Sequence, residues 1–263
     1  MVYIVIGGSK GIGKCTVDIL RADGHQVLDI SRSGDIKADI GKPEGRRHVI
    51  DTVHEMFPDG IDGLVANAGI PGGIRGQTAA DVISVNYFGC VEIIEGLYDL
   101  LEKKQGNVVV TTSASIAYGP RSKYNIDALL TSCDDEQRLR EFAMELEAGG
   151  HSFLMYNSTK HALTRWVKRV APSWAARGVI INGVAPGGVD TDIIPNMKTG
   201  PLFDTVTMAN PMPTVYKNRD LMTPESIAET IAFMVSPKAR GNCGTIVYCD
   251  GGSSAIVNTE VYY

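Results

Sequence analysis

The stretch Ile4-Val5-Ile6-Gly7-Gly8-Ser9-Lys10-Gly11-Ile12-Gly13 leads from an apolar run through a glycine-rich turn into a helical pattern. The apolar run is typical of a buried strand. Gly7 permits a tight turn, Gly11 lets the backbone approach a pyrophosphate, and Gly13 lets the helix pack closely on the strand. An ordinary strand–helix turn is the alternative interpretation. The position and spacing of the glycines favour a phosphate-binding turn at the start of an α/β sheet.

The rest of the chain continues this alternation of strand and helix. Nearly continuous apolar runs, typical of strands covered on both faces, lie at 3–6, 27–30, 64–66, 108–112, 179–184 and 245–249. Helical patterns lie at 13–22, 43–56, 80–101 and 224–236. Strands that alternate with helices predict a single doubly wound parallel sheet, a Rossmann-type three-layer α/β/α fold, within one domain spanning residues 1–263.

Two segments interrupt the alternation. Residues 118–150 stand where one crossover helix is expected, and 134–148 carry a helical apolar face, so we predict a helical insertion. Residues 193–222 are apolar and broken by prolines, a pattern typical of a lid over a ligand, and we predict a substrate lid at about 193–222.

Composition excludes several classes of protein. The 263 residues carry 25 Lys and Arg against 30 Asp and Glu, and this net charge of -5 disfavours nucleic acid as a partner. No run approaches the length of about 18 apolar residues that a membrane helix needs. The five cysteines form no C-x-x-C pair, so we expect neither a metal site nor disulfides. These features together predict a cytoplasmic protein.

Tyr156 and Lys160 lie four residues apart and therefore share one face of a helix. A nearby positive charge favours the phenolate of a tyrosine and so prepares it to exchange a proton. Ser113 directly follows the apolar run at 108–112, and Ser115 is a competing hydroxyl two positions later. We prefer Ser113 because it stands at the end of the strand.

The chain resembles the short-chain dehydrogenase/reductase family along essentially its whole length. The similarity rests on Gly7-x-x-x-Gly11-x-Gly13, on Asn67-Ala68-Gly69, on Asn86, and on Ser113 with Tyr156-x-x-x-Lys160. One departure is Ile6, which stands where the family usually has a threonine that braces the turn.

The resemblance implies a role for each matching residue. Tyr156 is expected to be the acid/base, Lys160 to lower its pKa and hold the cofactor ribose, Ser113 to polarise the carbonyl, and Asn86 to anchor a proton-relay water. The expected cofactor-binding residues are Gly7, Ser9, Lys10, Gly11, Ile12, Gly13, Ser31, Arg32, Asp39, Ile40, Asn67, Ala68, Gly69, Tyr156, Lys160, Pro186, Gly187, Val189 and Thr191.

The second strand indicates which nicotinamide cofactor is used. Alignment from Gly24 places Ser31 at the strand tip, followed by Arg32, and Lys10 adds a second cation. Cations there attract the 2'-phosphate of NADP(H), whereas a carboxylate would favour NAD(H). Asp29 keeps NAD(H) open as the alternative, because a shift of two residues would bring it to the tip.

Tyr156 follows Ser113 by 43 positions, against about a dozen in most of the family, because of the insertion. The same kind of insertion occurs in the bacterial 3α-hydroxysteroid dehydrogenase/carbonyl reductase branch, which the chain resembles in this feature. That resemblance implies an apolar substrate, a hydroxysteroid or bile acid, with other ketones as the alternative and a non-catalytic NADP-sensing protein as a second one. We expect a homodimer or homotetramer, whose assembly is altered where the insertion covers helices that relatives use to dimerise.

Overall fold

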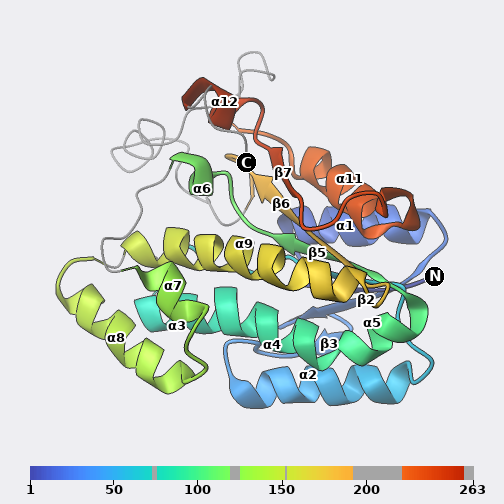
Figure 1. Ribbon diagram of the computed structural model, residues 1–263, viewed down its shortest axis with the longest axis horizontal. Coiled ribbons are helices and arrows are strands. Elements are labelled where there is room, and N and C mark those ends of the chain that lie inside the picture. Colours follow the sequence, from blue (N-terminus) through green and yellow to red (C-terminus); the bar gives the residue numbers. More distant parts are fainter. Residues whose placement is uncertain (73–75, 119–124, 152, 192–220, 258–263) are drawn as a thin grey trace.

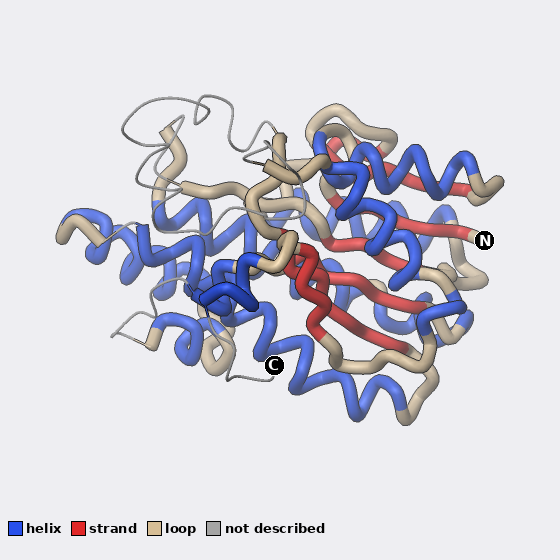
Figure 2. Tube along the Cα trace, turned by 90° about the horizontal axis from the view of Figure 1, so that it is seen from above, coloured by secondary structure: helices blue, strands red, loops and turns tan. Residues whose placement is uncertain are grey.

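The computed structural model describes residues 1–72, 76–118, 125–151, 153–191 and 221–257. Its centre is one parallel sheet of seven strands in the order β3-β2-β1-β4-β5-β6-β7, with helices on both faces (Figures 1 and 2). The strands are β1 (Val2–Ile6), β2 (Gln26–Ser31), β3 (Ile36–Lys37), β4 (Gly63–Ala66), β5 (Asn107–Thr111), β6 (Ile180–Pro186) and β7 (Ile246–Cys249). The predicted doubly wound fold is confirmed.

Alternate residues of the central strands point into two separate cores. Ile4 and Ile6 of β1 belong to one core, and Tyr3 and Val5 to the other. The valines of β5 likewise pack into both cores, and all residues of this strand are buried. This explains why the strands read as continuous apolar runs.

The first core is covered by α2 (Pro43–Met56), α4 (Gly89–Gly96), α5 (Tyr98–Lys104) and α9 (Phe153–Ala175). The second is covered by α1 (Gly11–Ala22) and α11 (Pro224–Val235), which pack against each other. A short 3-10 turn, η2 (Pro237–Ala239), and α12 (Ser253–Val257) complete the carboxyl-terminal part that the structure describes.

The helical segment predicted over 80–101 is confirmed in its extent, but it is not one regular helix. The structure has α3 (Ala79–Ile83), a π-helical turn η1 (Ser84–Phe88), and then α4 and α5, with a break at Leu97. Sequence periodicity hides these changes because apolar residues face neighbours on almost every side of this segment: Val82, Ile83, Phe88, Val91, Ile93 and Ile94 are all buried.

The inserted segment is helical, as predicted. It follows α6 (Ser115–Tyr118) and contains α7 (Ile126–Leu130) and α8 (Glu136–Ala148). An Asp135 side chain that accepts from the Arg138 backbone N–H caps the start of α8. The predicted lid at 193–222 lies almost wholly outside the described residues; Met222 forms an isolated bridge with Val189.

The insertion packs on helices of the first core. Helix α7 lies along α9, where Arg165 pairs with Asp127 at 2.8 Å. Helix α8 packs on α3, and the Glu147 carboxylate accepts the backbone N–H of Ala79 at 2.7 Å (Figure 1). These contacts place the insertion beside the helices that carry Asn86 and Tyr156.

Candidate active site

A cavity of about 910 Å³ lies at the carboxyl ends of the strands. The strand order reverses direction between β1 and β4, and the glycine turn after β1 forms part of its wall. Crevices at such a switch point are the usual ligand sites of open α/β sheets. The fold alone therefore indicates that this cavity is the ligand site.

The glycine turn is built by close approach of backbone to backbone. Gly7 has a φ of +84°, and a Cβ atom there would lie 2.8 Å from backbone atoms of Ala68. Gly13 lies under the turn, where any side chain would collide with the Gly7 carbonyl. Both positions therefore require glycine. The result is a turn with room for a phosphate group at the start of α1.

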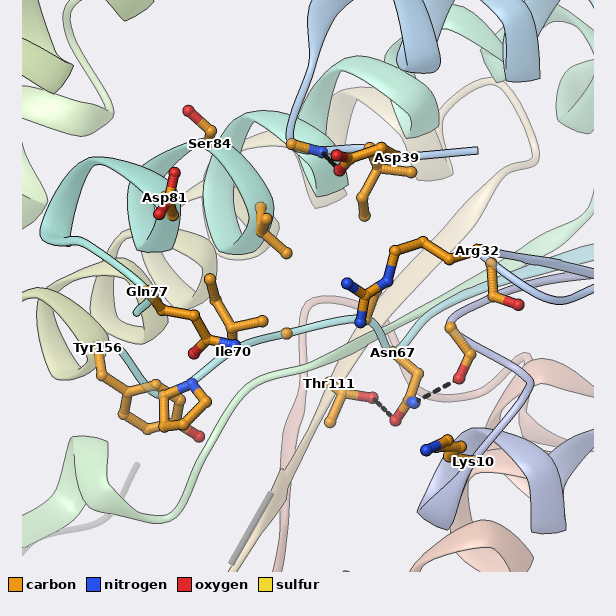
Figure 3. Close-up of a pocket in the computed structure, with 18 of the residues that line it drawn as sticks. Lys10, Arg32, Asp39, Asn67, Ile70, Gln77, Asp81, Ser84, Thr111 and Tyr156 are labelled. Atoms are coloured by element: carbon orange, nitrogen blue, oxygen red, sulfur yellow. Dashed lines mark hydrogen bonds between the residues drawn. The ribbon is translucent and has the colours of Figure 1, made fainter. Parts of the chain in front are cut away.

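Asn67 braces this turn. Its Nδ2 donates to the Gly7 carbonyl at 3.2 Å, and its Oδ1 accepts from the Thr111 hydroxyl, also at 3.2 Å (Figure 3). Ile6 has no hydroxyl to contribute, so this bracing comes from the ends of β4 and β5. Thr111 was not singled out in the sequence, because its role depends on the pairing of two distant strands.

The tip of β2 carries no carboxylate into the cavity. Ser31 is the last residue of the strand, and Ser31, Arg32 and Lys10 all line the cavity. Figure 3 shows the Arg32 side chain extending inward on the side of Asn67, with Lys10 nearby. The Asp29 carboxylate instead accepts the Gly8 N–H at 2.8 Å and the Ser31 hydroxyl at 3.3 Å, and it does not line the cavity.

The other end of the cavity holds Tyr156 and Lys160 from α9 and Ser113 from the end of β5. The Ser113 hydroxyl hydrogen-bonds to the Tyr156 phenol. Lys160 Nζ lies 5.7 Å from the Tyr156 ring centroid and donates to the Thr111 carbonyl at 2.8 Å. Ser115 is turned away and donates to Asn157 at 2.8 Å, so Ser113 is the hydroxyl that meets the tyrosine.

The pKa values of Tyr156 and Lys160 differ from those expected from the sequence. Burial raises the pKa of Tyr156, and the Ser113 hydrogen bond only partly opposes this. Burial also lowers the pKa of Lys160 to about 8. Lys160 is thus desolvated, and the expected lowering of the tyrosine pKa is not seen in the protein by itself. A lysine with a pKa near neutrality is nevertheless typical of functional sites.

Asn86 lies behind the cavity wall, within the π-helical turn. Its Oδ1 accepts the Ile70 N–H at 2.8 Å, and its Nδ2 donates to the Ile70 carbonyl at 2.9 Å and to Thr159 at 3.3 Å. Both amide donors are therefore used to tie the segment after β4 to α9. Local π turns occur frequently at functional sites.

The cavity brings together nearly all the predicted residues. Every predicted cofactor-binding residue lines it except Gly13, and so do Ser113, Tyr156 and Lys160 among the catalytic candidates. Besides Thr111, the sequence analysis missed Gln77 and three residues of α8, namely Glu136, Gln137 and Arg140, which also line the cavity. Polar residues on an inserted helix give no sequence signal that separates them from a solvated face.

The described residues form no candidate metal centre. No group of three or more His, Cys, Asp or Glu side chains among them could hold a metal ion. No helix in the described ranges is both long and apolar enough to span a membrane. The five cysteines are free thiols.

An α/β fold with a glycine turn, a Ser–Tyr–Lys group and a nucleotide-sized cavity defines a nicotinamide-dependent oxidoreductase. Comparison with known proteins agrees: the family described as short chain dehydrogenase matches residues 1–124, and the family described as Enoyl-(Acyl carrier protein) reductase matches residues 143–254. The chain belongs to the short-chain dehydrogenase/reductase family, whose enzymes act on CH–OH groups with NAD(P).

Three individual relatives show which members of the family this chain resembles. The chain is 32% identical to the 3-alpha-hydroxysteroid dehydrogenase/carbonyl reductase of Comamonas testosteroni, over 97% of both chains. The 3-alpha-hydroxysteroid dehydrogenase from Pseudomonas sp. B-0831, solved with NADH, is 30% identical, with a TM-score of 0.89 over 100% of both chains. A short chain dehydrogenase from Burkholderia cenocepacia J2315, solved with NADP, is 25% identical, with a TM-score of 0.71 over 96% of this chain and 97% of that one.

Proposed function

We propose that the protein is an NADP(H)-dependent oxidoreductase that interconverts a secondary alcohol and a ketone, with a hydroxysteroid or bile acid as substrate. The observation that carries this proposal is the hydrogen bond between Ser113 and Tyr156, beside the buried Lys160, at one end of the nucleotide-sized cavity. The cofactor would supply or accept the hydride.

The chain's own residues account for the proton and the charge. During ketone reduction, negative charge develops on the carbonyl oxygen, and the hydroxyls of Ser113 and Tyr156 are adjacent donors for it. Tyr156 gives its proton to that oxygen, and in the reverse direction it takes the proton from the alcohol. A charged Lys160 stabilises the phenolate left behind. Asn86 holds the neighbouring backbone of Ile70 in place.

The preference for NADP(H) rests on Arg32 and Lys10, two cations that line the cavity next to Ser31. Charged hydrogen bonds to a phosphate are stronger than neutral ones, and arginine suits phosphate geometry. NAD(H) is the alternative, favoured by the NADH bound to the Pseudomonas relative. The two proposals differ in the effect expected of Arg32→Asp, which weakens NADP⁺ binding only if Arg32 holds the 2'-phosphate.

The steroid assignment is supported by the names of the relatives from Comamonas and Pseudomonas. The same Comamonas enzyme is also named a carbonyl reductase, so reduction of other ketones is the second candidate. A non-catalytic NADP-sensing role is disfavoured because Ser113, Tyr156 and Lys160 are all present and adjacent.

The test is a comparison of wild type with Tyr156→Phe. Purified protein is screened against steroid alcohols and ketones with both cofactors, following absorbance of the reduced nicotinamide, while cofactor binding is measured by calorimetry. We expect Tyr156→Phe to bind cofactor normally and to lose at least about 100-fold in turnover. Unchanged turnover by the variant would rule out the mechanism, and wild-type activity on other ketones alone would rule out the steroid assignment.

We further propose that the protein is a cytoplasmic homo-oligomer. The five free cysteines suit a reducing compartment. Because α7 packs on α9 and α8 packs on α3, the insertion restricts how those helices can meet a second copy. Light scattering gives the oligomeric state, and a structure in which a tetramer is built on those same helices would contradict the role given to the insertion.

A further inference from the structure

The inserted helix α8 forms part of the cavity wall. Glu136, Gln137 and Arg140 all line the cavity, and their spacing places them on one side of the helix. They stand next to the start of α2 and next to Ser84 of the π turn, which line the cavity as well. An insertion that served only as surface elaboration would have no need to present three polar side chains to a ligand cavity.

The part of a dinucleotide that reaches this wall follows from the layout of the cavity. The nicotinamide must lie at Tyr156, where the chemistry is, and the pyrophosphate must lie at the glycine turn and the start of α1. The adenosine half therefore occupies the remaining end, bounded by Asp39, Ile40 and the start of α2. In Figure 3, Asp39 lies far from Tyr156, and Ser84 lies on the helical wall between them, next to Asp81.

A buried charge cluster fixes α8 against this end. Arg46 of α2 is only 1% exposed, and it pairs with Glu92 of α4 at 2.6 Å and with Glu136 of α8. Its Nη1 also donates to the carbonyl of Ile40 at 3.1 Å. A single guanidinium thus joins the backbone at the adenosine end to the first turn of the inserted helix.

A second set of contacts fixes the next turn of α8. Nη1 of Arg140 donates to the Ala80 carbonyl at 3.2 Å and to the Ser84 hydroxyl. This holds the plane of the guanidinium beside the cavity. Gln137 uses its Nε2 to bond Glu141 at 2.9 Å, which leaves its carbonyl oxygen as an acceptor. A planar cation and an amide acceptor suit a flat base with an exposed amino group.

We propose that α8 completes the adenosine subsite of the cofactor cavity, with Gln137 accepting a hydrogen bond from the adenine amino group and Arg140 packing against the base. This inference rests on the proposed function, because it assumes that a nicotinamide dinucleotide occupies the cavity. It assigns the insertion a role in holding the cofactor, independent of its role in assembly.

The test measures binding and not turnover. Isothermal titration gives dissociation constants for NADP⁺, NAD⁺, adenosine 2',5'-bisphosphate and nicotinamide mononucleotide, with wild type, Gln137→Ala, Arg140→Met and the double variant. Arg138→Met is the matched control, because Arg138 is exposed on the same helix and does not line the cavity. Gln137→Ala removes only a surface side-chain contact within α8, so it leaves the fold intact.

We expect each single variant to weaken the two dinucleotides and the bisphosphate by about 5- to 10-fold, as loss of one hydrogen bond or packed cation does. Mononucleotide binding and the control should not change. Wild-type affinity for both dinucleotides in the double variant would overturn the inference alone, as would an equal loss of mononucleotide binding. Failure of wild type to bind either dinucleotide would overturn the proposed function and the inference together.

Discussion

Lys160 donates a hydrogen bond of 2.8 Å from Nζ to the backbone carbonyl of Thr111, whose hydroxyl in turn holds Asn67. The residue that we assign to catalysis and the residue that braces the glycine turn are therefore joined through one threonine. The two ends of the cavity are coupled by the carboxyl end of β5.

The first prediction concerns the pH dependence of stability. Burial lowers the pKa of Lys160 from 10.5 to about 8, so between these values the unfolded chain binds more protons than the folded protein. Stability contributed by this site must therefore rise with pH across that window. The unfolding free energy of wild type relative to Lys160→Met should increase by at most about 3 kcal/mol.

Urea denaturation at a series of pH values measures this difference. Lys168→Met serves as the control, since Lys168 is exposed on the same helix. A flat difference for Lys160→Met would show that the buried ammonium is solvated or paired in solution.

The second prediction concerns cofactor choice. Arg32→Asp replaces a cation in the cavity by an anion that repels a 2'-phosphate, so the dissociation constant of NADP⁺ should rise on the order of 10- to 100-fold. That of NAD⁺ should stay the same or fall. Arg47→Asp, on the exposed face of α2, is the control for net charge. An unaltered ratio of the two constants in Arg32→Asp would exclude Arg32 as the phosphate ligand.

The third prediction concerns the bracing of the glycine turn. Thr111→Val keeps the shape of the side chain but leaves Asn67 Oδ1 without its donor. Asn67 should then hold the glycine turn less firmly, and both dinucleotides should bind about 5-fold more weakly. Thr111→Ser should restore most of the affinity, which calorimetry would show. Thr131→Val removes a hydroxyl at the end of α7, away from the cavity, and should have no effect on binding.

The fourth prediction concerns the buried charge cluster. Arg46→Met leaves the largely buried Glu136 and the partly exposed Glu92 without their common partner, and removal of one member of a buried pair such as Arg46–Glu136 costs about 3 kcal/mol of unfolding free energy. Adding Glu92→Gln and Glu136→Gln should recover part of the loss, because the uncompensated charges are then gone. A loss no larger than that of Arg47→Met in urea denaturation would contradict this account.

The sequence alone predicts the strands well because the central ones are buried on both faces. Residues 108–110 of β5, for example, are three consecutive valines, and all are fully buried. Pro43 and Pro224 likewise mark the first residues of α2 and α11. The short strand β3 has only two residues, Ile36 and Lys37, and it has no periodicity to detect.

The site is less predictable where it depends on tertiary contacts. Tyr156, Lys160 and the glycines are local motifs, and the structure places them around one cavity. Thr111 and Arg140 act through partners 44 and 56 positions away, at Asn67 and Ser84, and no local pattern encodes those pairings. The raised pKa of Tyr156 arises from burial, which sequence spacing does not report.

The π turn at Ser84–Phe88 separates the rotational registers of the helices on its two sides. An extra residue in one turn shifts every later side chain around the axis, so α3 and α4 keep independent facing directions. Helix α3 can therefore follow the contours of the insertion while α4 stays in register with the sheet. The π turn thus lets α3 pack on α8 and α4 pack on α2 with different side-chain directions, and Asn86 lies within the turn that separates them.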